Sequence, residues 1–124
     1  MGIRKSTATT EKIYLERSKN VDMINLYNQL RESVLSSFEN VVTAATKDYI
    51  SWRVDGGRQF ANLYIQKKKI RILTIEPVGK YTIGETVPDT HLWTLNYQTD
   101  IFSEKDICEV RKIILESYNR LVQW

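Results

Sequence analysis

The chain has 124 residues, of which 42% are apolar and 27% are charged, and this is the length and composition of one globular domain. Such a chain buries enough surface to fold without a structural metal, and its one cysteine, Cys108, excludes an internal disulfide framework. No apolar run is long enough for a membrane helix or a signal peptide, so we expect a cytoplasmic protein without membrane contact. Eighteen basic against fifteen acidic residues give a net charge of +3, which by itself does not establish a polyanionic partner.

The chain begins with the small, polar and basic stretch MGIRKSTATT, which predicts a flexible N-terminal arm that we extend over residues 1–19. Residues 20–124 contain no repeat and no internal boundary, so we interpret them as a single domain. The chain stops directly after a helical pattern and without a polar tail, which indicates a domain cut from a longer protein.

Apolar residues recur at spacings of three and four in two segments, which predicts two amphipathic helices. The first helix covers residues 21–38, is capped by Asn20 or Asp22, and buries a stripe formed by Met23, Tyr27, Leu30, Val34 and Phe38. The second covers residues 103–121 and begins with a capping box of Ser103 and Asp106. Its stripe consists of Ile107, Val110, Ile114, Tyr118 and Leu121. Cys108 lies beside this stripe, and we expect it to be a small core or boundary residue.

Between the helices the apolar period changes to two, which predicts strands over residues 49–54, 59–66 and 69–76. The Asp55-Gly56-Gly57-Arg58 sequence predicts a hairpin turn between the first two, and Lys67-Lys68 forms a second tight turn. Shorter strands are expected at residues 41–45 and 81–83, and another over residues 91–99 after a loop. Alternation buries Trp52 with Ile50 and Val54, and it groups Phe60 with Asn62 and Tyr64.

The order of elements is therefore helix, antiparallel meander of four to five strands, helix. Hairpins rather than crossovers favour an α+β fold in which both helices pack on one face of the sheet. The other face is left for solvent or for a partner.

Catalytic motifs are absent from the sequence. His91 is the only histidine, and the acidic residues are scattered, so no metal site is expected. No phosphate-binding glycine loop, nucleophile elbow or Cys-x-x-Cys motif occurs. We therefore expect a protein without cofactors that is not an enzyme.

The most distinctive feature is a cluster of basic residues in the predicted hairpins. Lys67, Lys68, Lys69 and Arg71 carry four positive charges within five residues, and Arg53 and Arg58 lie in the neighbouring hairpin. These six residues are candidates for phosphate contacts, with Tyr49, Tyr64 or Trp52 as stacking surfaces. The same residues would also keep an exposed hairpin soluble and prevent edge-to-edge strand pairing.

Two other surfaces are candidate sites. An uncovered aromatic sheet face would suit a protein partner or a homodimer. A pocket for a small molecule is predicted near His91, Trp93 and Tyr64, beneath the loop that precedes them.

Several motifs resemble a small bacterial and archaeal domain family of unknown function. They are Leu26-Tyr27-x-x-Leu30-Arg31, Tyr49-Ile50, Phe60, Gln66-Lys67-Lys68-Lys69-Ile70, His91 and Trp93, Ser103-Glu104-x-Asp106-Ile107, and Ile114-x-x-Ser117-Tyr118. This chain departs from the family after His91, where Leu92-Trp93-Thr94-Leu95 stands in place of a glycine-rich stretch. Some members carry the label "predicted transport protein", and others lie C-terminal to restriction-endonuclease-like domains. The element order also looks like the frataxin-like layout.

The resemblance implies an accessory domain rather than an enzyme. Together with the basic hairpin, it leads to the hypothesis of a module that contacts DNA or RNA weakly in a restriction or defence protein. A protein-interaction or dimerisation module and a small-molecule pocket are the alternatives.

Overall fold

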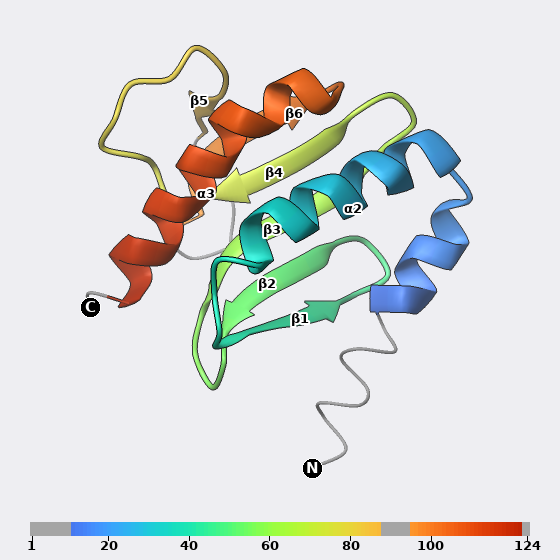
Figure 1. The fold of residues 1–124 in the computed structure, drawn as a ribbon, viewed down its shortest axis with the longest axis horizontal. Coiled ribbons are helices and arrows are strands. Elements are labelled where there is room, and N and C mark those ends of the chain that lie inside the picture. Colours follow the sequence, from blue (N-terminus) through green and yellow to red (C-terminus); the bar gives the residue numbers. More distant parts are fainter. Residues whose placement is uncertain (1–10, 88–94, 123–124) are drawn as a thin grey trace.

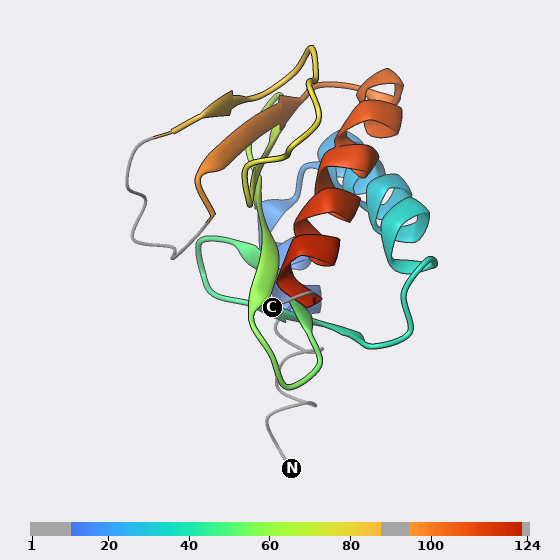
Figure 2. The same ribbon diagram turned by 90° about the vertical axis from the view of Figure 1, so that its left-hand side faces the viewer.

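The computed structural model describes residues 11–87 and 95–122, which form a six-stranded antiparallel sheet with helices packed on one face. Residues 11–18 are helical, and the further elements are α2 (Val21–Leu35), β1 (Val41–Ala45), β2 (Ile50–Val54), β3 (Gln59–Ile65), β4 (Ile70–Thr74), β5 (Glu85–Thr86), β6 (Tyr97–Ile101), the 3-10 helix η1 (Glu104–Asp106) and α3 (Ile107–Val122). The strand order is β1-β2-β3-β4-β6-β5. Figures 1 and 2 show α2 and α3 together on one side of the sheet. The predicted α+β fold is confirmed.

Helix α2 begins where the sequence predicts. The side chain of Asn20 accepts a hydrogen bond from the backbone N–H of Met23 at 3.3 Å, as expected of an N-cap. The helix ends at Leu35, three residues earlier than expected, because the chain turns there: Phe38 N donates to Leu35 O at 3.1 Å. Phe38 therefore packs against the core from this turn rather than from the helix.

Helix α3 follows η1, and its start is stabilised by the Asp106 carboxylate, which accepts hydrogen bonds from the N–H groups of Phe102 and Ser103. Its buried residues are Val110, Ile113, Ile114 and Ser117, whereas Ile107, Tyr118 and Leu121 are half-buried against the core. The expectation for Cys108 is wrong. Its side chain is exposed, because it lies about 100° around the helix from Ile107 and away from the buried stripe.

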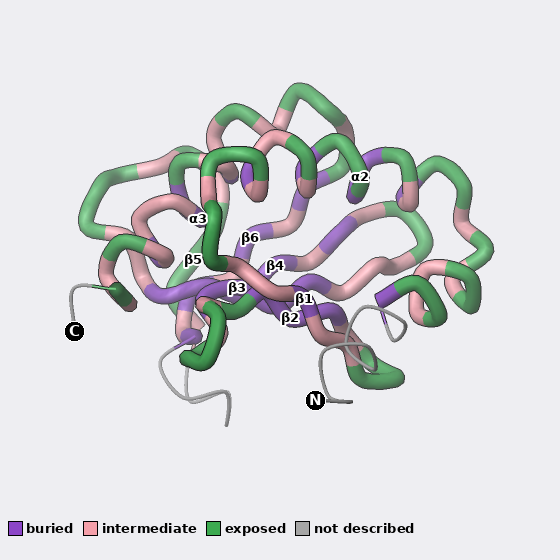
Figure 3. Tube along the Cα trace, turned by 60° about the horizontal axis from the view of Figure 1, so that its bottom comes forward, coloured by how far each residue is buried: buried purple, intermediate pink, exposed green. Residues whose placement is uncertain are grey.

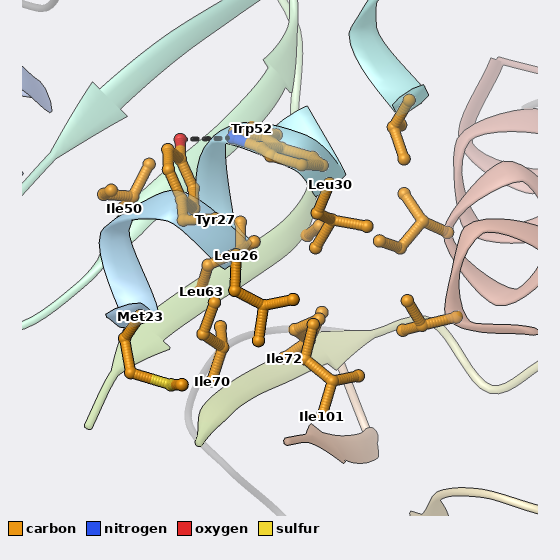
Figure 4. Close-up of a cluster of buried hydrophobic side chains, with 14 of the residues drawn as sticks. Met23, Leu26, Tyr27, Leu30, Ile50, Trp52, Leu63, Ile70, Ile72 and Ile101 are labelled. Atoms are coloured by element: carbon orange, nitrogen blue, oxygen red, sulfur yellow. Dashed lines mark hydrogen bonds between the residues drawn. The ribbon is translucent and has the colours of Figure 1, made fainter. Parts of the chain in front are cut away.

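The core lies between the helices and the sheet, as the band of buried residues in Figure 3 shows. Figure 4 shows side chains of α2 meeting those of β2, β3, β4 and β6. Trp52 is fully buried, as predicted, and its indole N–H donates to the Tyr27 hydroxyl at 3.1 Å. A second buried hydroxyl, that of Ser117, joins α3 to the sheet. Ser117 Oγ donates to Phe60 O at 2.6 Å and accepts from Ile75 N at 3.0 Å.

A β-bulge changes the predicted faces of β3. Trp52 pairs with Ala61 and Arg53 with Gln59, so Phe60 is an extra residue without a partner of its own in β2. A bulge breaks the alternation of side chains at that point. Phe60 is fully buried on the helix side, where its ring lies 5.3 Å from that of Tyr118. The predicted grouping of Phe60 with Asn62 and Tyr64 is therefore wrong.

The segment before α2 is not the flexible arm that we expected up to residue 19. Residues 11–18 are helical, and the carboxylate of Glu11 is buried against α2 and β1. It accepts hydrogen bonds from Arg31 Nε at 2.9 Å, from Thr43 Oγ1 at 2.9 Å and from the Tyr27 hydroxyl. A polar sequence can form a fixed helix when such a carboxylate meets buried donors. The expectation for residues 1–10 lies outside the described residues.

The segment between β4 and β6 differs most from expectation. The predicted strand at residues 81–83 is absent, and the short strand β5 forms at residues 85–86 instead. Gly84 has a φ of +94°, and a Cβ there would lie 2.5 Å from a ring carbon of Tyr97. Only glycine permits this conformation and this close approach. The strand predicted from residue 91 begins at Tyr97, and residues 91–94 lie outside the described residues.

No helix within residues 11–87 and 95–122 combines the length and apolar character that crossing a membrane requires.

Candidate nucleic-acid interface

The lysine-rich turn joins β3 to β4. Gln66 N donates to Lys69 O at 2.9 Å to close this turn, and the Asn20 side chain donates to the carbonyls of Gln66 and Lys67 at 3.2 and 2.8 Å. The turn is thus fixed to the start of α2. Lys67 and Lys68 are exposed, and neither forms an ion pair with a described residue.

Lys69 and Arg71 are held by a single carboxylate on the neighbouring strand. The β4–β6 register places Arg71 opposite Asp100, whose oxygens accept from Arg71 Nε at 3.0 Å and from Lys69 Nζ at 3.0 Å. Partial burial opposes ionisation of Asp100, but these hydrogen bonds outweigh it and lower the pKa of the carboxyl group. The bond to Asp100 correspondingly raises the pKa of Arg71. Two cations share one anion, so this triad carries one net positive charge.

Two tyrosine rings lie next to this triad on the helix-free face of the sheet. Because Ile50 pairs with Leu63 and both face the core, Tyr49 and Tyr64 lie beside each other on the opposite face. Their ring centroids are 5.2 Å apart at an interplanar angle of 41°. Tyr64 in turn pairs with Arg71 across the β3–β4 ladder. Both rings are half-buried, whereas Trp52, the third aromatic candidate, is buried in the core and cannot stack on a ligand.

Arg53 and Arg58 lie at the other end of β3. Arg53 pairs with Gln59, the first residue of β3, and Arg58 precedes Gln59 in the hairpin. Lys67 lies two residues after the last residue of β3. A strand of seven residues separates the two ends by about 20 Å. The structure therefore brings together Lys69 and Arg71, with Lys67 and Lys68 in the same turn, but not the two arginines of the other hairpin.

The middle of the helix-free face is not open. Ser51 and Asn62 are buried there, and Leu73 packs against Ile75 and Leu95 in a second, smaller core. In the described part of the chain, neither polar atom of the Asn62 side chain has a hydrogen-bond partner. Near the lysine turn, the row of Tyr49, Tyr64 and Arg71 is half-buried and so remains partly accessible on this face.

The predicted small-molecule pocket is described only in part. His91 and Trp93 lie outside the described residues, and Tyr64 lies beside Tyr49 on the helix-free face of the sheet. Across residues 11–87 and 95–122, no group of three or more His, Cys, Asp or Glu side chains is arranged to hold a metal ion.

Comparison with known proteins gives a family. Residues 10–120 match the family described as "Domain of unknown function (DUF5655)". The chain belongs to this family. No curated protein and no solved structure matches the chain. The DUF5655 match begins just before Glu11 and includes the basic turn, so the helix of residues 11–18 is part of the family's domain rather than an appendage.

Sequence reasoning missed two residues that define the DUF5655 basic turn. Asn20 was expected to cap α2 but also binds the turn through its side-chain amide, 46 and 47 residues away along the chain. Asp100 neutralises part of the basic cluster, and only the register between β4 and β6 reveals this. Neither contact has a local sequence signal.

Proposed function

We propose that this chain is a non-catalytic accessory domain that binds DNA or RNA weakly through the turn between β3 and β4. The observation that carries the proposal is the position of Lys67 and Lys68 at the end of the strand that bears Tyr64, next to the Tyr49–Tyr64 pair. Both lysines are exposed, and neither forms an ion pair with a described residue. The context of a restriction or defence protein, which the sequence resemblance implies, belongs to the same proposal.

The chemistry of these groups suits a nucleic-acid backbone. Lysine ammonium groups neutralise phosphates and release counterions, which makes binding depend on salt. A half-exposed tyrosine ring offers a surface on which any base can stack. Lys69 and Arg71 support the site with one net charge, because Asp100 binds both. Such a site contacts phosphates more than base edges, so we expect little sequence preference.

Fluorescence anisotropy with single- and double-stranded oligonucleotides at low salt tests the proposal. We expect K67Q/K68Q to weaken binding and to reduce the slope of log K against log salt by about two, since each lysine that contacts a phosphate contributes about one. The variant R53Q/R58Q removes the same charge from two exposed arginines at the other end of β3 and should bind like the original protein. Binding that survives charge reversal of Lys67, Lys68 and Lys69 would contradict the proposal.

Asp100→Asn is the converse test. The substitution removes the carboxylate that binds Lys69 and Arg71, so both cations become available to phosphates. We expect tighter binding and a steeper salt dependence than in the original protein, provided that circular dichroism shows an unchanged fold. Unchanged or weaker binding by a folded D100N would show that Lys69 and Arg71 take no part.

The alternative function is dimerisation or protein binding through the same end of the sheet. Phe102 favours it, because this residue is 57% exposed and its ring lies beside Lys69, whose Nζ is 6.0 Å from the ring centroid. Sedimentation of the purified chain separates the two functions. A stable dimer that Phe102→Ser dissociates, together with no oligonucleotide binding, would favour the alternative.

A further inference from the structure

A second basic site lies between α3 and the loop that follows β4. A cavity of about 390 Å³ opens there, and its lining residues are Lys80, Tyr81, Thr82, Lys105, Cys108, Glu109 and Lys112. Figure 1 shows this loop running beside the N-terminal half of α3. Three lysines from three different segments, namely the loop, η1 and α3, thus converge on one cavity.

The positive charge of this cavity is largely unneutralised. None of its three lysines forms an ion pair with a described residue, in contrast to Lys69, Arg71 and Arg31. The only carboxylate in the lining, Glu109, accepts instead from the Thr82 hydroxyl at 2.6 Å and from the N–H groups of Thr82 and Ile83. These hydrogen bonds, with the Thr82 hydroxyl first among them, and the nearby charge of Lys112 lower the pKa of Glu109. The three lysines and the one glutamate in the lining together carry a net charge of +2.

The loop is held in place by carboxylates of α3. Glu116 accepts from the N–H of Val78 at 2.8 Å, from the N–H of Gly79 and from the Tyr81 hydroxyl. Its hydrogen bond raises the pKa of Tyr81 to about 12, so this hydroxyl is a donor at neutral pH. A Cβ on Gly79 would lie 2.8 Å from a Glu116 oxygen, so a larger residue there would displace this carboxylate. Lys80 therefore lies between two positions that are fixed to α3, and the cavity is formed before any ligand arrives.

We propose that this cavity binds a small organic phosphate with two or more negative charges, held by Lys80, Lys105 and Lys112. Lysine binds phosphate as a point charge, and three ammonium groups suit an anion of that charge. The volume of about 390 Å³ falls within the range of about 300 to 1,000 Å³ found for ligand pockets and exceeds what one phosphate group occupies. The site is independent of the proposed nucleic-acid interface, because the two share no residue.

The single cysteine of the chain reports on this cavity. Cys108 is exposed and belongs to the lining, so a ligand in the cavity should shield its thiol from a neutral reagent such as N-ethylmaleimide. The probes are ADP, ribose 5-phosphate and inorganic pyrophosphate, each compared with sodium chloride at equal ionic strength. At a probe concentration of about ten times Kd, roughly one cavity in ten is empty, so labelling should slow about tenfold.

Matched variants decide whether the lysines are responsible. We expect K80Q/K105Q/K112Q to lose the protection. The single variant K80Q leaves α3 unchanged, and we expect it to weaken binding by about tenfold, which corresponds to about 1.4 kcal/mol. The control K12Q/R17Q/K47Q removes three exposed charges elsewhere and should keep it. Protection by sodium chloride alone, protection by pyrophosphate but by neither organic phosphate, or full protection in the triple lysine variant would each overturn the proposal.

Discussion

Substitution of Glu11 tests whether the helix of residues 11–18 is part of the folded domain. Glu11 is 7% exposed, and its carboxylate accepts four hydrogen bonds: two from Arg31, one from Thr43 and one from Tyr27. In Glu11→Gln the side chain keeps its shape but loses its charge, and one oxygen becomes an NH₂ group that cannot accept. The NH₂ group then faces the buried hydroxyl of Tyr27 or of Thr43, so a donor meets a group that donated to the carboxylate.

The expected cost follows from these contacts. A hydrogen bond to a charged group contributes about 1.5 to 3 kcal/mol, and a buried donor without a partner costs about 1 to 3 kcal/mol. The pair with Arg31 adds less than a buried pair would, because the Arg31 side chain is 41% exposed and water screens it. We therefore expect Glu11→Gln to lower the free energy of unfolding by about 2 to 4 kcal/mol. In a domain of this size, that loss corresponds to a decrease in Tm of about 10 °C.

Urea unfolding followed by far-UV circular dichroism measures this cost, and Glu16→Gln provides the control because Glu16 is exposed in the same helix. The urea midpoint should fall by about 1 to 2 M for Glu11→Gln, with little change for the control. Equal stability of the two variants would refute the assignment of residues 11–18 to the domain. Tyr27→Phe, made in the original protein and in Glu11→Gln, would measure the coupling energy between Glu11 and Tyr27 directly.

Three further predictions concern the segment around β5 and the buried contacts of α3. Gly84→Ala should destabilise the fold by about 1 to 3 kcal/mol more than Gly56→Ala, as thermal unfolding would show, because both glycines have positive φ but only position 84 lacks space for a Cβ. Ser117→Ala leaves two buried backbone groups unpaired and should cost about 2 kcal/mol or more, whereas the exposed control Ser36→Ala should change the urea midpoint little. Burial opposes ionisation of Glu116, but its hydrogen bonds outweigh burial and lower its pKa. The contribution of Glu116 to stability is therefore present above the ordinary glutamate pKa and is lost as pH falls through the lowered value. A carbon-13 titration that gives this carboxyl group an ordinary or raised pKa would contradict the prediction.

The elements that sequence predicts well are those with local signals. The spacing of Leu30 and Val34 predicts α2, and the Gly56-Gly57 pair predicts the hairpin between β2 and β3. Both signals act between residues that are neighbours in the chain, so they can be read without the tertiary structure. The position of Trp52 in the core follows in the same way from the period of two.

The features that sequence reasoning missed depend on distant partners. Glu11 belongs to a helix of polar appearance, and only the donors on α2 and β1 explain its burial. The bulge at Phe60 places two successive residues on one face, which no alternation pattern predicts. In the candidate interface, the lysine turn could be predicted, but its partial neutralisation by Asp100 depends on the register of two strands that lie about 25 residues apart.

The position of α3 in the chain has a consequence for folding. The strands β1 to β4 each pair with their neighbour in sequence, so these hairpins can form early and locally. The apolar face of these strands, however, is covered in part by α3, which follows β1 to β6 in the chain. Arg111 of α3 also donates to the carbonyl of Ser33 near the end of α2. During synthesis the part of that face that α3 covers stays exposed until residues 107–122 leave the ribosome. We therefore expect a nascent chain that ends before α3 to be bound by chaperones and prone to aggregation.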